Sequence, residues 1–285
     1  MEAREGTWLQ VHSRFVPIDE AVLRRLYADE RLTLRDVAAR LGCGATTISR
    51  CLRLFMISVR PRGPLPLRDV SGLVWSPEVA YAVGLIATDG NLSRDGRHIT
   101  VVSKDLDLLE TLRRCFGLGV SVSTFRSKSG RIAGRIQWSD RVLYDALLTI
   151  GLTPAKSLTL GPLAIPDDYF PDFFRGCIDG DGSVLVYTDR YHAAKNERYV
   201  YRRLYVSLAS ASRLFLDWVQ ANVQKFTGIS GVVQAHQKKG CRVIWLLRYA
   251  KRESLRILRW IYYAPGVPSL LRKRAKAELF MSGIR

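Results

Sequence analysis

Two aspartates stand out because each ends an apolar stretch and is followed directly by glycine. Asp89 closes the segment AVGLIATDG at 82–90, and Asp181 closes the segment FRGCIDGDG at 174–182. The spacing of apolar residues before each one predicts a helix, so each carboxylate would stand at the negative, C-terminal end of a helix dipole. Carboxylate oxygens are ligands that Mg²⁺ prefers, and a bound cation would stabilise acids in that position. Metal-dependent chemistry is therefore the first activity to consider for this chain.

The pattern of elements around these aspartates occurs twice. Alternating residues predict strands at 91–93, 99–103, 120–126 and 131–138, and again at 183–191, 200–208, 232–236 and 243–248. Besides the two helices that end at the aspartates, helices are expected at 107–116, 142–150, 213–226 and 252–262. The order helix, two strands, helix, two strands, helix thus appears twice, and a duplicated α+β unit is the simplest account of it.

A separate helical domain is expected before this repeat. From about 19 to 57 the apolar spacing is helical, Thr33 is a fair N-cap, and Gly42 stands where a left-handed helix end is wanted. The stretch resembles a helix-turn-helix, in which the small Ala38 lets two helices cross closely. A three-helix protein-binding module is the alternative, although basic and hydroxyl side chains gather on the third helix. The residues expected to enter a DNA major groove are Thr46, Thr47, Ser49, Arg50 and Arg53.

Prolines and arginines interrupt the helical pattern between the two regions. They predict a basic, proline-rich linker that lies along DNA, and Ser76 with Pro77 then begins a new helix. The expected organisation is a helix-turn-helix domain at 1–60, a linker at 61–76, a first half at 77–162 and a second half at 163–285.

The two nine-residue segments resemble the signature of the LAGLIDADG family, and the resemblance covers about 77–285. It implies two pseudo-symmetric αββαββα halves with antiparallel, saddle-shaped sheets. Gly84 and Gly176 fall at the central glycine of the signature, where the absence of Cβ lets two helix backbones approach closely. That crossing would bring Asp89 and Asp181 together on a pseudo-two-fold axis.

The resemblance implies a homing endonuclease that makes a staggered double-strand break in a long, asymmetric DNA target. The enzyme would be a monomer, free-standing or intron-encoded, and would hydrolyse phosphodiester bonds with two or more Mg²⁺ ions. Following the family pattern, the metal ligands would be the carboxylates of Asp89 and Asp181 and the carbonyls of Thr88 and Gly180. A structural capping pair without catalysis is the alternative for the two acids.

Two lysines near the ends of the halves also match the family pattern. The resemblance gives Lys156 and Lys273 the role of stabilising the charge of the reactive phosphate or activating water. Solvated surface lysines are the equal alternative. The first signature departs from the family at Ala87, where an acid is usual; this change is expected to weaken a helix cap more than the chemistry.

The alternating strands predict sheets with one face on the core and one on a ligand. Arg and Lys can bind guanine edges or phosphates, and Gln can bind adenine. A solvated strand face is the alternative for each residue taken alone. The residues expected on the DNA-binding faces are Arg126, Lys128, Arg131, Arg135, Gln137, Tyr187, Arg190, Arg198, Tyr201, Arg203, Gln234, His236, Gln237, Lys238, Arg242 and Arg248.

Charge and composition agree with a nucleic-acid partner. The chain of 285 residues has 44 Lys and Arg against 26 Asp and Glu, a net charge of +18. Residues 166–285 hold 21 of the basic and 10 of the acidic side chains. Such a surplus favours a polyanion. Five scattered cysteines indicate neither zinc nor disulfides, and four scattered histidines disfavour histidine-based nuclease sites. Without a signal peptide or long apolar run, the chain is expected to be intracellular and to have no membrane partner.

Two other functions remain open at this stage. The first is a transcriptional regulator that combines a catalytically inactive LAGLIDADG fold with a helix-turn-helix. The second is an RNA maturase that assists intron splicing, which the same basic sheets would support. Retention of both acids favours the nuclease.

Overall fold

The computed structural model describes residues 18–30, 32–59, 73–127, 130, 132–191, 196, 199–237, 240 and 242–282. The chain divides into two compact units, Met1–Arg62 and Gly63–Arg285. Four of the expected DNA-binding residues, and most of the expected linker, lie outside the described residues; the four are Lys128, Arg131, Arg198 and Lys238.

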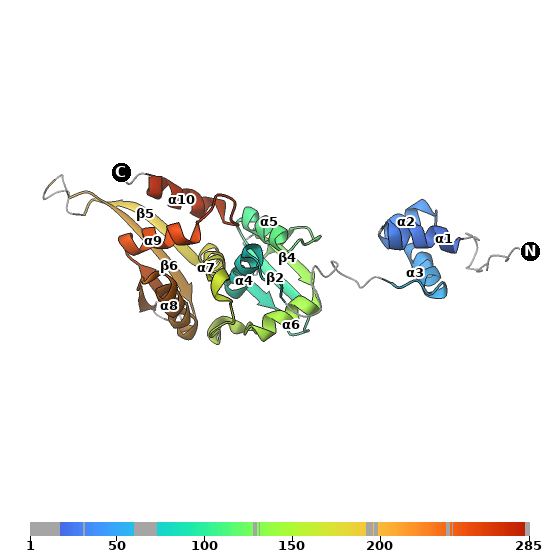
Figure 1. Cartoon of the computed structure of the whole chain (residues 1–285), viewed down its shortest axis with the longest axis horizontal. Helices are drawn as coiled ribbons and strands as arrows, with labels where there is room; N and C mark the ends of the chain where they lie inside the picture. Colours follow the sequence, from blue (N-terminus) through green and yellow to red (C-terminus); the bar gives the residue numbers. More distant parts are fainter. Residues whose placement is uncertain are drawn as a thin grey trace, which may run out of the picture. The chain divides into compact units, whose positions relative to one another are not determined.

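The smaller unit is helical, as the sequence predicted (Figure 1). Its elements are α1 (Glu20–Arg24), the π-helical turn η1 (Arg25–Asp29), α2 (Leu34–Arg40) and α3 (Ala45–Leu54). The Thr33 hydroxyl accepts a hydrogen bond from the Asp36 amide at the start of α2, and Gly42 adopts φ +65° where that helix has ended. Its core holds nine buried residues, among them Leu23, Val37 and Ile48. The π-helical turn η1 was not predicted, because the apolar spacing there indicated only α-helix.

The larger unit contains two antiparallel sheets of four strands each, so the predicted α+β class is confirmed. The first half comprises α4 (Pro77–Asp89), β1 (Gly90–Leu92), β2 (His98–Ser103), α5 (Leu106–Cys115), β3 (Ser123–Arg126), β4 (Ile132–Ser139) and α6 (Arg141–Thr149). Two short 3₁₀ turns, η2 (Lys156–Leu158) and η3 (Asp167–Tyr169), follow. The second half comprises α7 (Phe170–Asp179), β5 (Gly182–Asp189), β6 (Tyr201–Ser210), α8 (Arg213–Thr227), β7 (Val232–His236), β8 (Ile244–Tyr249), α9 (Lys251–Ile261) and α10 (Leu271–Ser282).

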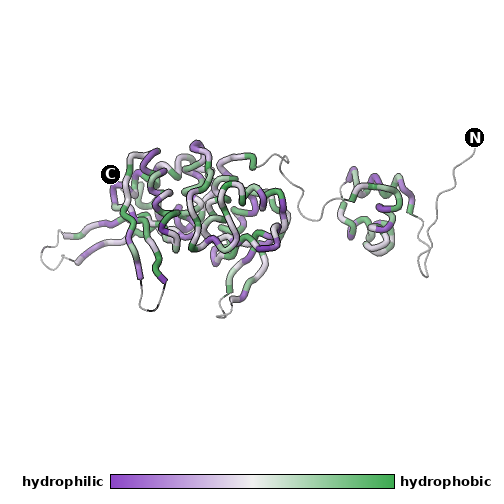
Figure 2. The backbone as a smooth tube through the Cα atoms, turned by 90° about the horizontal axis from the view of Figure 1, so that it is seen from below, coloured by the Kyte–Doolittle hydropathy of each residue, from purple (hydrophilic) through white to green (hydrophobic). Residues whose placement is uncertain are grey.

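The two sheets have equivalent topology. The strand orders are β1-β2-β4-β3 and β5-β6-β8-β7, which are the same order shifted by four strands. Helices α4 and α7 lie side by side between the sheets (Figure 1), and the hairpins of both sheets extend from the helix-rich body (Figure 2). One hydrophobic core joins the two halves through these helices.

Strand register decides which side chains face the core. Directly paired residues share a face of an antiparallel sheet, and successive residues alternate. In the first sheet Ile99 pairs with Trp138 and Val101 pairs with Ile136, and all four side chains are buried beneath the helices. The opposite face of each sheet carries no described helix and is called the open face below.

Helix α10 was not predicted. Its segment LRKRAKAELF carries four basic residues, so the spacing of its few apolar residues does not indicate a helix. Only Lys273, Ala277 and Phe280 are buried, at a spacing of one helical face, and one of these three is charged. The helix packs on β5.

Candidate functional site

The helices α4 and α7 cross with their backbones in contact. A Cβ atom added to Gly84 would lie 2.2 Å from the Phe173 carbonyl oxygen, and one added to Gly176 would lie 2.1 Å from the Tyr81 carbonyl oxygen. Such distances leave no room for any side chain. The structure therefore brings together the two glycines that the sequence assigned to the helix interface.

A second pair of glycines makes the chain turn directly after each aspartate. A Cβ atom added to Gly90 would lie 2.6 Å from the Ile86 Cα atom, and one added to Gly182 would lie 2.5 Å from the Ile178 Cα atom. Helix α4 therefore passes directly into β1 at Gly90, and α7 passes into β5 at Gly182 after two residues, Gly180 and Asp181. The two aspartates thus mark equivalent helix–strand junctions.

The C-terminal ends of the two helices meet. A Cβ atom added to Gly180 would lie 2.1 Å from Thr88 Oγ1 and 3.3 Å from Asp89 Oδ2. Burial and, next, the nearby charge of Asp181 raise the pKa of Asp89 to about 6, against the opposing charges of Lys273 and Lys156. Burial also raises the pKa of Asp181. The two carboxylates are therefore close enough to repel each other, and the Asp89 side chain is half-buried whereas Asp181 is exposed.

The two lysines are buried beside these acids. Lys156 is 6% exposed and Lys273 is 4% exposed, so the alternative of solvated surface lysines is wrong. Lys156 Nζ donates a hydrogen bond to the Gly90 carbonyl. Lys273 Nζ donates to the equivalent Gly182 carbonyl at 2.7 Å. Each lysine thus holds the carbonyl of the residue that follows the aspartate of its own half.

Lys273 makes further bonds to the end of α7. Its Nζ atom lies 2.7 Å from the Ile178 carbonyl oxygen, 2.8 Å from that of Asp179 and 3.2 Å from that of Gly180. Carbonyls at a helix C-terminus lack partners within the helix, and a cation there also interacts favourably with the dipole. Burial lowers the pKa of both lysine ammonium groups to about 8, and the nearby acids oppose this shift.

The residues at this junction fit a divalent cation in part. Mg²⁺ is commonly held by one or two carboxylates together with substrate phosphates and water, and Asp89 and Asp181 provide such a pair. A cation would also relieve the repulsion and burial that raise their pKa values. Within the described part of the chain no group of three or more His, Cys, Asp or Glu is present. The Gly180 carbonyl, one of the expected ligands, already accepts a hydrogen bond from Lys273.

A hollow of about 230 Å³ lies beside the junction. Thr88, Lys156 and Asp181 form part of its wall. Ala209 and Ile244 also line it, and the register places both on the open face of the second sheet. A polyanion lying on that sheet can therefore reach the Asp181 carboxylate through this hollow.

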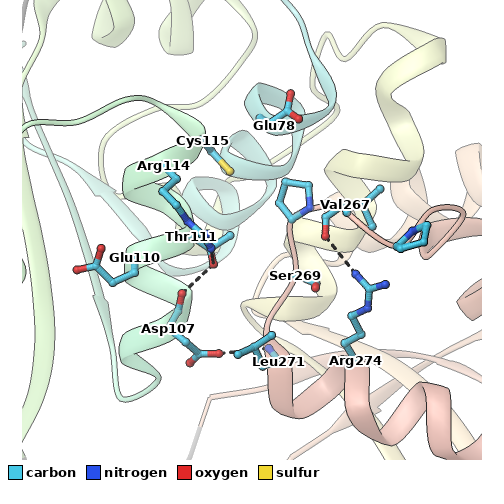
Figure 3. A pocket seen from close by; sticks show the side chains of 13 residues that line it. Glu78, Asp107, Glu110, Thr111, Arg114, Cys115, Val267, Ser269, Leu271 and Arg274 are labelled. Carbon is cyan, nitrogen blue, oxygen red and sulfur yellow. Dashed lines mark hydrogen bonds between the residues drawn. The ribbon is translucent and has the colours of Figure 1, made fainter.

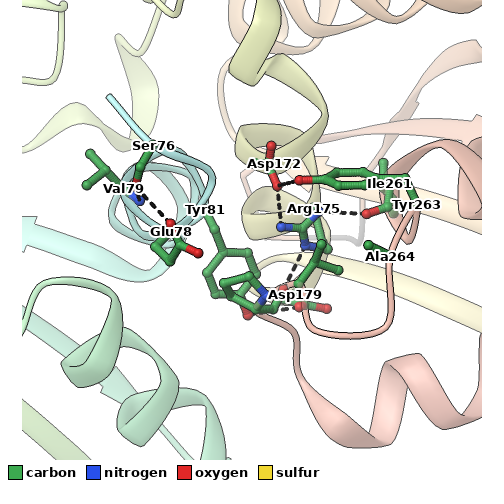
Figure 4. A network of polar contacts seen from close by, with 12 residues as sticks. Ser76, Glu78, Val79, Tyr81, Asp172, Arg175, Asp179, Ile261, Tyr263 and Ala264 are labelled. Carbon is green, nitrogen blue, oxygen red and sulfur yellow. Dashed lines mark hydrogen bonds and ion pairs between the residues drawn. The ribbon is translucent and has the colours of Figure 1, made fainter. Parts of the chain in front are cut away.

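A buried polar network joins α7 to the end of α9 and to the segment that leads into α10 (Figure 4). The fully buried Arg175 guanidinium pairs with Asp172 and donates to the carbonyls of Ile261 and Pro268. Asp179 Oδ2 accepts hydrogen bonds from the Tyr81 hydroxyl at 2.9 Å and from the Leu270 amide at 2.7 Å, directly before α10. The network therefore fixes the segment that carries Lys273.

The two halves differ at the position of Asp179. Its equivalent in the first signature is Ala87, which offers no acceptor. A separate contact joins the two halves: Arg272 makes two hydrogen bonds, of 2.7 and 2.8 Å, to the Asp105 carboxylate at the start of α5. Sequence reasoning singled out neither Arg175 nor Arg272, since an isolated arginine gives no signal of its partner.

The register distributes the expected DNA-binding residues unequally. Arg126 pairs with Ile132, on the strand face that carries the core residue Ile136, and so points away from the open face. Arg190, Gln237 and Arg242 lie just outside the strands. Those on the open faces are Arg135, Gln137, Tyr187, Tyr201, Arg203, Gln234, His236 and Arg248.

The groove residues expected in the smaller unit all lie on α3. Thr46, Arg50 and Arg53 are exposed, whereas Thr47 and Ser49 are half-buried. The helix thus presents two arginines and a hydroxyl to solvent.

A larger cavity of about 430 Å³ lies between α5 and the segment that leads into α10 (Figure 3). Its polar groups already have partners: Asp107 accepts from the Leu271 amide, and Arg274 pairs with Glu278. Burial raises the pKa of the Cys115 thiol to about 12, so this sulfur is a poor nucleophile. The junction of α4 and α7 is therefore the better candidate site.

No protein-family profile and no curated protein matches the sequence. Similar solved structures include full-length DUF199/WhiA from Thermatoga maritima, with 18% identity, a TM-score of 0.45 and a match over 76% of this chain and 65% of that one. They also include I-DmoI in complex with DNA and Ca, with 13% identity, a TM-score of 0.46 and a match over 74% and 100% of the two chains. The I-LtrWI LAGLIDADG homing endonuclease bound to target DNA shares 12% identity over 72% and 90%, with a TM-score of 0.48. The chain thus spans about two thirds of the length of the WhiA protein.

Among the described residues, no helix combines the length and the apolar character that crossing a membrane requires.

Proposed function

We propose that this chain is a site-specific DNA endonuclease that uses divalent cations at Asp89 and Asp181. The observation that carries the proposal is the pair of carboxylates at the meeting ends of α4 and α7, half-buried at Asp89 and exposed at Asp181, each with its pKa raised. A fold that holds two repelling acids close together beside a hollow incurs a free-energy cost that a bound cation would offset.

The bound cation would polarise a phosphate and lower the pKa of water, which is the chemistry that phosphodiester hydrolysis needs. Asp89 and Asp181 would hold it, with the Thr88 and Gly180 carbonyls beside them. Lys156 and Lys273 take a positioning role in this proposal. Their ammonium groups donate to backbone carbonyls and so fix the turn after each aspartate, while their charges favour an approaching phosphate.

Double-stranded DNA would lie along the open faces of the two sheets. Arg135, Arg203 and Arg248 lie on these faces and would contact phosphates or guanine edges, Arg203 after release from its ion pair with Asp189. The helical unit at 1–60 would add flanking contacts through Arg50 and Arg53 on α3. Because the two halves share one chain but not one sequence, a monomer would suit an asymmetric target.

Cleavage of DNA drawn from a randomised library, in the presence of Mg²⁺, tests the proposal. Wild-type protein is expected to enrich cut sites, and Asp181→Asn is expected to abolish cutting while binding is retained. Asp145→Asn is the matched control, because Asp145 lies on α6 with 60% of its side chain exposed. Equal cutting by Asp181→Asn, or no cutting of any bound site, would refute the nuclease.

A DNA-binding regulator without catalysis is the second candidate. The Lys273 ammonium already occupies the Gly180 carbonyl, which leaves fewer ligands for a metal. This reading predicts tight, sequence-specific binding that neither Mg²⁺ nor Asp181→Asn changes. The same library, analysed for bound rather than cut sequences, separates the two functions.

A further inference from the structure

The open face of the second sheet carries an array of aromatic rings. Tyr187 on β5 and Tyr201 on β6 are 42% and 46% exposed, and Tyr205 on β6 is half-buried. The register pairs Tyr187 with Arg203 and Ser207 with Arg248, so both arginines share this face with the tyrosines. These five side chains, three tyrosines and two arginines, are called the tyrosine–arginine array.

The members of the array lie against one another. The rings of Tyr187 and Tyr205 stack with centroids 6.3 Å apart and planes 26° from parallel. Arg248 Cζ lies 3.7 Å from the centre of the Tyr205 ring, and Arg203 Cζ lies 5.3 Å from the centre of the Tyr201 ring. Ring planes and guanidinium planes thus form one continuous surface. The Arg203 guanidinium also pairs with the Asp189 carboxylate on the same face at 3.0 Å, which offsets its positive charge.

The first sheet shows that the fold itself does not need these rings. It has the equivalent topology, yet the open face of its central strands carries Thr100, Arg135 and Gln137 among its residues and no tyrosine, phenylalanine or tryptophan. On the edge strand β3, Phe125 shares that face, with Arg135 Cζ 5.7 Å from its ring centre, whereas the second sheet has tyrosines on both its edge strand β5 and its central strand β6. A general preference of strands for aromatic residues would apply to both sheets alike. The array therefore points to a ligand of the second sheet.

We propose that the tyrosine–arginine array binds unpaired nucleotides by stacking their bases. Half-exposed aromatic rings and arginine planes on a four-stranded antiparallel sheet are a recurring way to hold unstacked bases. In an intact duplex the faces of the bases are covered by their neighbours, so stacking on these rings requires a single strand, a loop or a frayed end. The positive guanidinium groups complement the phosphates of such a strand. Helices α8 and α9 pack on the other face of the sheet and hold the array rigid.

This inference does not depend on catalysis at the aspartates, and it adds a second ligand class to the proposed duplex target. The full-length chain would be titrated, in EDTA so that no strand is cut, against labelled oligonucleotides of about twelve nucleotides, within the usual site sizes for single strands. The probes are oligouridine RNA, oligothymidine DNA and a DNA duplex of equal length. A fluorescent adenine analogue within a single strand reports stacking by loss of emission.

The variants separate ring stacking from hydroxyl contacts and from charge. Tyr187→Leu and Tyr205→Leu remove a ring, and each is expected to weaken single-strand binding about fivefold or more. Tyr187→Phe and Tyr205→Phe keep the ring and remove the hydroxyl, so affinity should stay within about twofold. Two positions are used because Tyr205 is more buried than Tyr187, so that Tyr205→Leu is more prone to unfold. Unfolding curves would show whether each leucine variant is folded.

The emission of the adenine analogue should fall on binding to wild type and to the phenylalanine variants, and less so with the leucine variants. Equal effects of leucine and phenylalanine, or no loss of emission, would overturn the proposal, since binding would then rest on charge or hydroxyl groups. Equal affinity for the RNA and DNA strands would support recognition of bases alone. Preference for RNA would support the array together with a contact to the ribose hydroxyl. Because this assay contains EDTA and no free metal, a negative result would leave the nuclease proposal intact. A negative result in the cleavage assay would likewise leave the proposal for the tyrosine–arginine array intact.

Discussion

Replacing Asp89 by asparagine is expected to stabilise the fold at neutral pH when divalent cations are removed. Burial and the charge of Asp181 raise the pKa of Asp89 from 3.8 to about 6, so the fold disfavours the ionised carboxylate. Asparagine has nearly the same shape and carries no charge. The substitution therefore removes the unfavourable charge without creating a cavity.

The pKa shift sets the size of the effect. A shift of about 2 pKa units corresponds to about 3 kcal/mol, and this is an upper bound because the side chain is only partly buried. Below about pH 4 the carboxyl group is protonated in both the folded and unfolded states, so the two proteins should be equally stable. As pH rises from 4 to 6 the unfolded state ionises first, and the wild type loses stability relative to Asp89→Asn. The advantage of the variant is then constant above about pH 6.

Urea unfolding at several pH values between 4 and 8, in EDTA, measures this difference. Asp145→Asn serves as the control, because its side chain is 60% exposed and should give no comparable pH-dependent gain. A variant less stable than wild type at pH 7, or a stability difference that does not grow between pH 4 and 6, would refute the electrostatic account of the junction.

Three further predictions follow from the geometry of the crossing and the junction. Gly84→Ala should lower the free energy of unfolding by roughly 3 kcal/mol in thermal unfolding, because the new methyl group would lie 2.2 Å from a backbone oxygen. The control is Gly119→Ala, whose Cβ atom would meet nothing within 4 Å and which should change that free energy by less than about 1 kcal/mol. Lys273→Met should lower the free energy of unfolding in urea by roughly 2 kcal/mol, because four carbonyls lose a buried hydrogen-bond donor. The control is Lys276→Met at an exposed position of the same helix, which should change that free energy by less than about 0.5 kcal/mol. Ca²⁺ at about a hundred times its Kd should stabilise the wild type by about 2.7 kcal/mol and Asp181→Asn by much less. The measurement is the shift of the melting temperature on adding Ca²⁺, and an equal shift in both proteins would mean that the cation binds elsewhere.

Much of the fold could be predicted from the sequence because local signals and the duplication agree. Helix starts such as Ser76–Pro77 follow local capping rules, and the strands alternate clearly. Helix α10 could not be predicted because its buried face includes Lys273, and a lysine counts as polar in any apolar pattern. The burial of that lysine depends on carbonyls more than ninety residues earlier in the chain.

The site could be predicted only as far as residue types and spacing allow. The resemblance of the two nine-residue segments to a known signature indicated which helices cross, at Gly84 and Gly176, and that Asp89 and Asp181 meet there. Strand register, by contrast, depends on turns that a single sequence does not fix, so Arg126 was expected on the wrong face and Tyr205 was not noticed. The network around Arg175 depends on contacts between segments far apart in sequence.

The crossing of α4 and α7 is made of main chain on main chain, at Gly84 and Gly176. Its spacing is therefore set by van der Waals contact between main-chain atoms and does not depend directly on which side chains fill the rest of the interior. Mutations elsewhere in the two halves can change the outer surfaces of the sheets while the gap between the paired acids stays the same. The duplicated architecture can thus diversify what it recognises on each side independently, with the central spacing conserved by the backbone itself.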